Sequence, residues 1–241
     1  MSSIIVIPTF NEAESIGPLC HAIVAIMPTV HVLVVDDNSP DGTASVAGAL
    51  FKSQPAFANY RVLTRTGPRG LGRAYRDGFA VAMDEGYDFI LQMDADLSHD
   101  PKYLPRLIEL AQDRDLVIGS RYCGGGGLVD WPWHRRLLSR FANAYVRWIT
   151  RLPFTDATAG FRCWSLEGLR RIDLPTVSSE GYSFQVEMSY RAAMARLRCV
   201  EMPIVFTDRK GGESKISRKV LFESMVRPWA LRVMGWKMPR E

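Results

Sequence analysis

The sequence predicts an α/β fold in which a mostly parallel sheet is flanked by helices. Short apolar runs, the first at residues 4–7, alternate with segments of helical character along the first half of the chain. These runs are continuously apolar, as expected for parallel strands that are buried on both faces. With 241 residues and 47% hydrophobic composition, the chain can bury the core of one large domain, or of one domain with a tail.

Five strands are expected in the first half, each leading into polar loop residues. They are placed at 4–7, 32–35, 60–63, 89–93 and 116–119. The first helix is expected to begin at Ser15, because Pro18 is tolerated only in a first turn. Further helices are expected at 43–50, after the glycine-rich segment 67–72, and from Asp100, which would cap a helix that begins with Pro101.

The chain is organised around residues 89–101, FILQMDADLSHDP. The apolar run ends in Asp94 and Asp96, and residues two apart in extended backbone point to the same side. Carboxylates at the carboxyl end of a sheet strand lie where open α/β sheets bind ligands, and their oxygens suit Mg²⁺ or Mn²⁺ with substrate phosphates. A single D-x-D is common, so a solvated aspartate beside a helix cap is an equal alternative on these residues alone.

Other predicted strands also end in polar or charged residues. These are Thr9 and Glu12, Asp36 and Asp37, and Arg121. Because parallel strands gather their carboxyl ends at one edge, we expect these side chains to share a pocket with the D-A-D residues. The segment 70–72 lacks the complete G-x-G-x-x-G of a dinucleotide site, and tight helix–strand packing is the better explanation of its glycines.

The second half has a different character. A glycine run at 124–127 precedes W-P-W and a predicted helix at 134–152, in which aromatic residues and arginines are interspersed. This helix either lies in a membrane interface or packs on the sheet as an ordinary helix. A strand at 161–164, a helix at 184–197 and a last strand at 199–206 follow. The basic loop after it could fold over phosphates, and the tail at 216–241 is expected to be an interfacial or partner-binding helix.

Composition adds bounds on location and partners. The net charge of +4 suits an anionic substrate or a membrane surface, and we expect no nucleic-acid partner. Four scattered cysteines fit a reducing compartment. We find no signal peptide and no apolar run of about 20 residues, so the chain is not expected to cross a membrane.

Five motifs occur in a familiar order: PTFNE (8–12), VDDNSPDGT (35–43), MDADLSHDP (93–101), GSRY (119–122) and DRKGGESK (208–215). With them the chain resembles, over essentially its whole length, the polyprenol-phosphate (dolichol-phosphate) mannose synthases, which are inverting GT-A-type glycosyltransferases. The first three motifs are shared with many GT-A enzymes. GSRY with the glycine run and W-P, and the late DRKGGESK, are more specific.

The resemblance implies transfer of mannose from GDP-mannose to a polyprenyl (dolichyl) monophosphate, with Mg²⁺ or Mn²⁺. By position, it places Pro8, Phe10, Glu12, Val35 and Asp37 at the guanosine. It places Asp94, Ala95 and Asp96 at the diphosphate and ribose, with Asp96 and Ser98 as metal ligands. It places Arg121, Arg135, Arg209 and Lys215 at the donor and acceptor phosphates. Asp94, Asp96 and Arg209 would be the catalytic residues.

The resemblance also implies a GT-A domain over 1–215, including the helix at 134–152, and an amphipathic tail over 216–241. The chain would be peripheral on the cytoplasmic face of the membrane, alone or with a separate integral membrane protein. Phe10 and Ser98 depart from common forms, Tyr and Gln respectively. Two alternatives stay open: a related transferase with another nucleotide sugar, such as a glucosyl enzyme, and a non-catalytic nucleotide-sugar-binding module.

Overall fold

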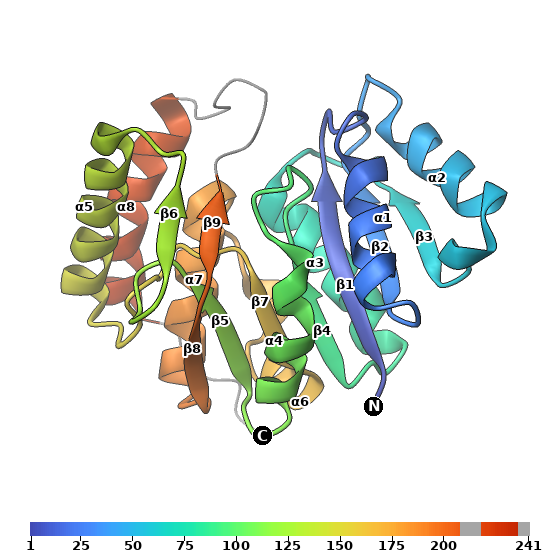
Figure 1. Ribbon diagram of the computed structural model, residues 1–241. Coiled ribbons are helices and arrows are strands. Elements are labelled where there is room, and N and C mark those ends of the chain that lie inside the picture. The colour runs from blue at the N-terminus through green and yellow to red at the C-terminus, as the bar shows by residue number, and fades with distance from the viewer. Residues whose placement is uncertain (208–217, 236–241) are drawn as a thin grey trace.

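The computed structural model describes residues 1–207 and 218–235 (Figure 1). Its main sheet has seven strands in the order β3-β2-β1-β4-β7-β5-β8. The strands are β1 Ser3–Thr9, β2 His31–Asp36, β3 Tyr60–Thr64, β4 Phe89–Gln92, β5 Leu116–Ser120, β7 Arg162–Ser165 and β8 Cys199–Pro203. All neighbours are parallel except β7, which runs antiparallel between β4 and β5. The predicted mostly parallel sheet is confirmed.

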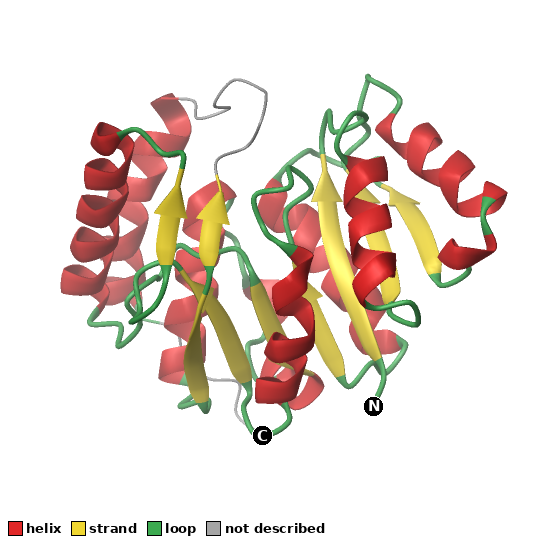
Figure 2. Cartoon of the chain, in the orientation of Figure 1, coloured by secondary structure: helices red, strands yellow, loops and turns green. Residues whose placement is uncertain are grey.

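Helices cover both faces of this sheet (Figure 2). They are α1 Ile16–Ile26, α2 Thr43–Ser53, α3 Leu71–Asp84, α4 Leu104–Ala111, α5 Trp133–Thr150, α6 Leu166–Arg170, α7 Gly181–Met194 and α8 Arg218–Met234. Three short 3₁₀ helices lie at Pro55–Phe57, Pro101–Tyr103 and Leu174–Thr176. The first helix begins after Ser15, and the side chain of Asp100 accepts a hydrogen bond from Lys102 N, so both predicted helix starts are confirmed.

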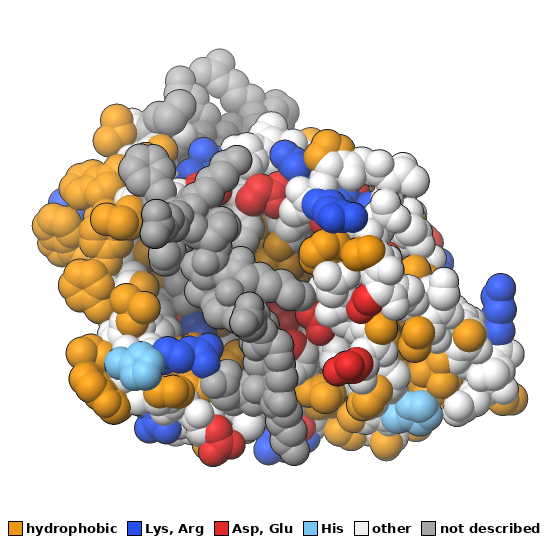
Figure 3. Space-filling model, turned by 90° about the horizontal axis from the view of Figure 1, so that it is seen from above, with side chains coloured by type: hydrophobic (Ala, Val, Ile, Leu, Met, Phe, Trp, Pro, Cys, Tyr) orange, Lys and Arg blue, Asp and Glu red, His pale blue; other side chains and the backbone are white. Residues whose placement is uncertain are grey.

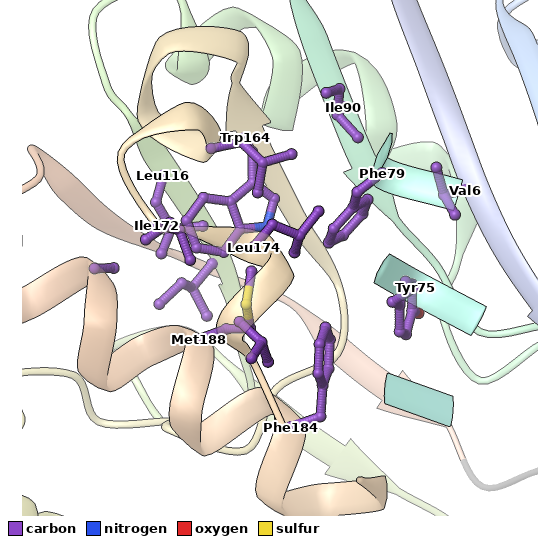
Figure 4. Packing of buried hydrophobic residues seen from close by; sticks show 14 of the residues in the cluster. Val6, Tyr75, Phe79, Ile90, Leu116, Trp164, Ile172, Leu174, Phe184 and Met188 are labelled. Carbon is purple, nitrogen blue, oxygen red and sulfur yellow. The ribbon is translucent and has the colours of Figure 1, made fainter. Parts of the chain in front are cut away.

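The sheet separates two hydrophobic clusters. On one face α1 and α4 pack on the sheet through Leu19 and Leu107. On the other, α3 and α7 pack together through Tyr75 and Phe184, whose rings stack at 5.5 Å (Figure 4). Because Gly78 has no side chain, α3 can approach β1 closely: a Cβ there would lie 2.5 Å from Val6 Cγ1. The amino end of α3, which follows β3 in the chain, lies at the carboxyl edge of the sheet, where Gly70 N donates to Asp37.

The predicted strand at 199–206 is wrong as a single element. It divides at Ile204 into β8, which pairs with β5, and β9 Val205–Thr207, which pairs in parallel with β6 Gly127–Val129 in a second, two-stranded sheet. Pro203 cannot donate a ladder hydrogen bond, which explains why regular pairing ends there. The glycine run leads into β6 of this small sheet and lies at the same edge of the main sheet as the D-A-D residues (Figure 1).

Helices α5 and α8 pack on each other at the β8 end of the molecule, and α8 also contacts α7 (Figure 1). The hydroxyl of Tyr145 on α5 donates to Met225 O on α8, at 2.9 Å, and accepts from Trp229 Nε1 at 3.0 Å. The two predicted amphipathic segments are therefore neighbours that form one outer layer.

Candidate active site

The D-A-D residues form a tight loop directly after β4, at the carboxyl edge of the sheet. Ala95 is buried, whereas Asp94 and Asp96 are partly exposed. The loop reverses at Leu97, whose φ of +63° is unusual for a leucine. Ser98 stabilises this turn, because its N–H and its hydroxyl both donate to Asp96 Oδ1, at 3.1 and 2.5 Å. The loop is therefore held in one shape by its own side chains.

Asp94 is held from two sides. The hydroxyl of Tyr75 on α3 donates to Asp94 Oδ1 at 3.1 Å, and the backbone N–H of Asp94 donates to His99 Nδ1 at 3.1 Å. Both partners are buried. Burial, and next the Asp94 charge, raise the pKa of Tyr75 well above its ordinary value, so Tyr75 keeps its proton and stays a donor. Burial lowers the pKa of His99 despite the nearby aspartates.

The carboxyl ends of β1 and β2 lie side by side, with Thr9 opposite Asp36. Asp36 is buried and accepts hydrogen bonds from Thr9 Oγ1 at 2.9 Å and from both Ser39 N and Oγ. Asp37 is paired with the buried guanidinium of Arg65 and accepts from Gly70 N at 2.6 Å. Asp36 thus orders the loop that follows β2, and Asp37 connects this loop to the amino end of α3.

The PTFNE motif, residues 8–12, forms the end of β1 and the loop that follows it at the carboxyl edge of the sheet. Pro8 is buried in β1, and the ring of Phe10 lies 4.6 Å below the guanidinium carbon of Arg69. Glu12 accepts from Ser15 Oγ at 2.9 Å, and its N–H donates to Thr43 Oγ1. The structure thus brings the proposed guanosine residues, Val35 included, to the adjoining ends of β1 and β2. Their role at a base stays a prediction.

Arg121 follows β5 at the same edge, and its guanidinium already has a carboxylate partner. Its Nε and Nη2 donate to the two oxygens of Asp156, each at 2.7 Å, and Nη2 also donates to Thr158. Asp156 is fully buried. The structure therefore gives Arg121 a role in holding the 153–160 loop, and its proposed contact with a substrate phosphate stays a prediction.

The glycines at 70 and 72 pack tightly, but not against a strand, so that part of the prediction is wrong. A Cβ on Gly72 would lie 2.4 Å from the backbone oxygen of Ser179. Gly72 N donates to Glu180 Oε2 at 3.0 Å, and Arg73 lies 3.3 Å from Glu180 Oε1. Helix–strand packing through a glycine occurs six residues after Gly72, at Gly78.

Helix α8 is bonded to this same segment. Arg227 donates to Ser179 Oγ at 2.7 Å and to Glu187 Oε2 at 2.9 Å, and Glu223 Oε1 accepts from Glu180 N at 3.3 Å. Glu187 is buried and is also paired with Arg191. We call residues 178–181 the clamp segment, because α8 binds one side of it and the amino end of α3 binds the other.

Of the other residues predicted to bind phosphate, Arg135 lies near the glycine run in the sequence. Arg135, in the first turn of α5, stacks its guanidinium on Trp131 at 4.4 Å. Gly126 approaches the backbone of Ser120 and Arg121 so closely that a Cβ would lie 2.6 Å from Ser120 O. Arg209 and Lys215 lie outside the described residues, as does the whole DRKGGESK motif.

The donor atoms of the D-A-D loop fit a divalent cation. Mg²⁺ and Mn²⁺ prefer oxygen ligands, and Asp94, Asp96 and Ser98 supply carboxylates and a hydroxyl. Within residues 1–207 and 218–235, no group of three or more His, Cys, Asp or Glu side chains is arranged to hold a metal. That Asp96 and Ser98 are the ligands stays a prediction.

Away from this edge, α5 and α8 expose an apolar surface. Figure 3 shows apolar side chains gathered over the α5 and α8 end of the molecule, and acidic side chains near its centre. The exposed residues, which we call the α5–α8 surface, are Trp133, Leu137, Leu138, Phe141, Trp148, Met225, Val226, Trp229 and Val233. The rings of Trp148 and Trp229 pack edge to face at 6.0 Å. None of the described helices is both long and apolar enough to span a bilayer.

Three residues at this edge were not predicted: His99, Asp156 and Glu180. His99 lies inside the quoted DADLSHDP motif, so its position three residues after Asp96 was a usable signal. Asp156 and Glu180 lie 35 and 108 residues from the partners they bind, and nothing in the local sequence indicates those contacts.

Residues 4–174 match the family model described as glycosyl transferase family 2. The undecaprenyl-phosphate mannosyltransferase of Micrococcus luteus is 44% identical over 226 residues, which cover 94% of this chain and 92% of that protein. The polyprenol monophosphomannose synthase of Mycolicibacterium smegmatis is 42% identical over 233 residues, covering 95% and 87%.

Among solved structures, glucosyl-3-phosphoglycerate synthase of Mycobacterium tuberculosis, in complex with Mn²⁺, UDP-glucose and phosphoglyceric acid, superimposes with a TM-score of 0.67. The match covers 95% of this chain and 80% of that one at 17% identity, so it shows the fold alone. Together with the family match it confirms the expected GT-A-like fold.

Proposed function

The chain belongs to glycosyl transferase family 2, and we propose that it transfers mannose from GDP-mannose to a polyprenyl monophosphate with inversion. The products would be polyprenyl-phosphate mannose and GDP. The observation that carries the proposal is the pair of polyprenyl-phosphate mannose transferases that are similar over at least 94% of the chain. The D-A-D loop at the carboxyl edge of the sheet supports the proposal, because its carboxylates could bind a metal ion that carries the leaving diphosphate.

The nucleophile in this reaction is an oxygen of the lipid phosphate. A phosphate monoester has a second pKa of about 6, so it is mostly anionic at neutral pH and needs no strong general base. Its oxygen forms a bond to C1 of mannose while the bond from C1 to the diphosphate breaks, and attack from the opposite side inverts the anomeric configuration. The protein must therefore hold two anionic groups in line and close together.

On the donor side, we infer that Pro8, Phe10, Glu12, Val35 and Asp37 surround the guanosine and that Asp94, Ala95 and Asp96 face the ribose and diphosphate. The ordered ends of β1 and β2 and the fixed D-A-D loop support this. Asp96 and Ser98 would hold Mg²⁺ or Mn²⁺, which when bound neutralises charge on the leaving diphosphate. The Mn²⁺ in the complexes of the structurally similar synthase agrees with a divalent ion.

On the acceptor side, we infer that Arg135 binds the lipid phosphate, because it lies at the first turn of α5 beside the α5–α8 surface. Arginine forks bind phosphate oxygens in pairs, which suits this duty. We infer that Arg121 contributes to binding of the substrate phosphates, while its pairing with Asp156 fixes the 153–160 loop. Arg209 and Lys215 complete the proposed set of phosphate-binding residues.

The proposal is tested by incubating the protein with polyprenyl phosphate and, in separate reactions, GDP-mannose, GDP-glucose or UDP-glucose. We expect a lipid product heavier by one hexose with GDP-mannose only, detected by mass spectrometry, and a β-linked mannose by NMR. A hexosyl lipid formed from UDP-glucose instead would establish the glucosyl alternative. Binding of a nucleotide sugar without any lipid product would establish the non-catalytic one.

We also propose that the α5–α8 surface lies on the membrane that holds the lipid acceptor. Trp148 and Phe141 are 72% and 67% exposed within this apolar surface, and exposed apolar patches mark protein or membrane interaction sites. The same two helices also expose four arginines: Arg136, Arg140, Arg147 and Arg232. Such a mixture of aromatic residues and arginines suits the interface of an anionic leaflet, and the cytoplasmic face has that charge.

Liposome flotation tests this second proposal. The protein should float with anionic vesicles at low salt and be released as salt rises, because each arginine near the surface contributes about 1 kcal/mol. Trp148→Ser should weaken binding by at least about tenfold, since burial of a large apolar side chain is worth roughly 1.5–3 kcal/mol.

Val46→Ser is the matched control, because Val46 is an exposed apolar residue on α2. It should bind the vesicles as the wild type does. Failure of the wild type to float at low salt would contradict direct membrane binding and would require a separate integral membrane protein as the anchor.

A further inference from the structure

His99 has an environment that packing alone does not require. Its ring is buried, stacks on Phe161 with the ring centroids 4.8 Å apart, and meets the edge of Phe206 in β9 at 5.5 Å. A phenylalanine would fill this aromatic slot. The imidazole instead accepts a hydrogen bond from Asp94 at Nδ1 and has Nε2 within 4.0 Å of the same residue.

The hydrogen-bond geometry fixes the tautomer of this ring. A backbone N–H can only donate, so the bond from Asp94 N to Nδ1, at 3.1 Å, requires Nδ1 to carry a lone pair. The ring proton is then on Nε2, which lies 4.0 Å from Asp94 Oδ2. This distance is too long for a hydrogen bond, so any attraction between Nε2–H and the carboxylate is electrostatic only.

Contacts with two further residues restrict the orientation of the Asp94 carboxylate. Tyr75 donates to Oδ1, and Oδ2 lies over Gly160, where a Cβ would be 3.4 Å away. Tyr75 therefore fixes one oxygen, and His99 fixes the backbone from which the side chain projects and lies near the other oxygen. The Asp94 side chain still has 38% of its surface exposed.

We propose that His99 is a positioning residue, which holds Asp94 in the orientation that meets the metal–diphosphate part of the donor. The proposal rests on the proposed function, because it takes the D-A-D loop to be the site where metal and nucleotide bind together. It goes further by assigning the hydrogen bond at Nδ1, rather than the bulk of the ring, as the reason for a histidine at this position.

Two substitutions separate the hydrogen bond from the packing. His99→Phe keeps an aromatic ring in the slot and removes the acceptor for Asp94 N–H. His99→Asn loses the ring, but its Oδ1 can take the place of Nδ1. The measurement is the affinity for GDP by calorimetry, with and without Mn²⁺, since a positioning role acts on the increase in affinity that Mn²⁺ provides.

In the wild type, Mn²⁺ should tighten GDP binding. In His99→Phe that increase should shrink by about three- to tenfold, the equivalent of one hydrogen bond, whereas His99→Asn should retain it within about twofold. GDP affinity without Mn²⁺ should be similar in all three proteins. If the phenylalanine variant does not fold, His99→Gln replaces it, because its amide extends past the Nδ1 position.

His31→Phe is the matched control. His31 also bonds through Nδ1, to the hydroxyl of Tyr87, but lies at the amino end of β2, so its loss should not change the effect of Mn²⁺. The proposal is overturned if the Phe and Asn variants are equally impaired, or if neither differs from the wild type. Absence of any Mn²⁺ effect in the wild type would instead overturn the proposed metal–nucleotide site, and with it the role of His99.

Discussion

Asp96→Ala is expected to abolish mannosyl transfer. The Asp96 carboxylate is the partly exposed end of a loop that Ser98 holds rigid, so its charge can act on a ligand without reorganisation. Loss of such a preorganised electrostatic group costs about a hundredfold to a thousandfold in kcat. Steady-state kinetics with GDP-mannose and polyprenyl phosphate measure this, and removal of metal with a chelator should have the same effect until Mg²⁺ or Mn²⁺ is restored.

Two variants make this result interpretable. Asp96→Asn keeps a side-chain oxygen as the acceptor for Ser98 and removes only the charge, so it should fold as the wild type does and still be inactive. Asp100→Asn makes the same change four residues later, at a helix cap that asparagine serves as well, and should be fully active. Undiminished activity in the presence of chelator would contradict the assignment of Asp96 to a metal.

Asp156→Ala is expected to have the largest effect on stability, about 3–5 kcal/mol, because it leaves the Arg121 guanidinium uncompensated in a buried position. In a chain of this size that lowers the Tm by about 10 °C, measurable by calorimetry. The double variant Arg121→Met, Asp156→Ala should recover much of the loss, since it removes both charges.

The matched control is Arg106→Ala, which breaks an exposed pair with Glu109 and should cost less than about 0.5 kcal/mol. If Asp156→Ala is no more destabilising than this control, the Arg121–Asp156 pair does not hold the 153–160 loop.

The same pair predicts how stability depends on pH. Burial by itself would raise the pKa of Asp156, but the charge and hydrogen bonds of Arg121 outweigh it and lower the pKa. A carboxyl whose pKa is lower in the folded state stabilises the fold above its unfolded pKa of about 3.9. That contribution is lost as the pH falls through the folded pKa, so the wild type should lose stability below about pH 4 more steeply than Asp156→Asn.

Features of the fold that depend on neighbouring residues in the chain could be predicted from the sequence. Apolar runs, turn residues and strand geometry account for the five strands of the first half, the helix starts at Ser15 and Asp100, and the position of Asp94 and Asp96 after β4. Pro203, which divides the last predicted strand, was also a local signal, although its effect was not anticipated.

Features that depend on contacts between distant segments were not predictable. Strand β7 enters the sheet antiparallel between β4 and β5, and an isolated apolar run carries no information on direction. Arg121 reads as a free cation until the fold brings Asp156 to it. The glycines at 70 and 72 gave the correct expectation of close packing but not their partner, the clamp segment.

Through the clamp segment, α8 is connected to the carboxyl edge of the sheet, so the two are expected to unfold together. Local unfolding proceeds in units whose members lose their contacts together. Detaching α8 would remove Arg227 from the buried carboxylate of Glu187 and Glu223 from Glu180 N, and Glu180 in turn holds Gly72 at the start of α3. A chain shortened to end before Arg218 would therefore lose more than a surface helix: the ordering of α3 beside Asp37 would weaken with it.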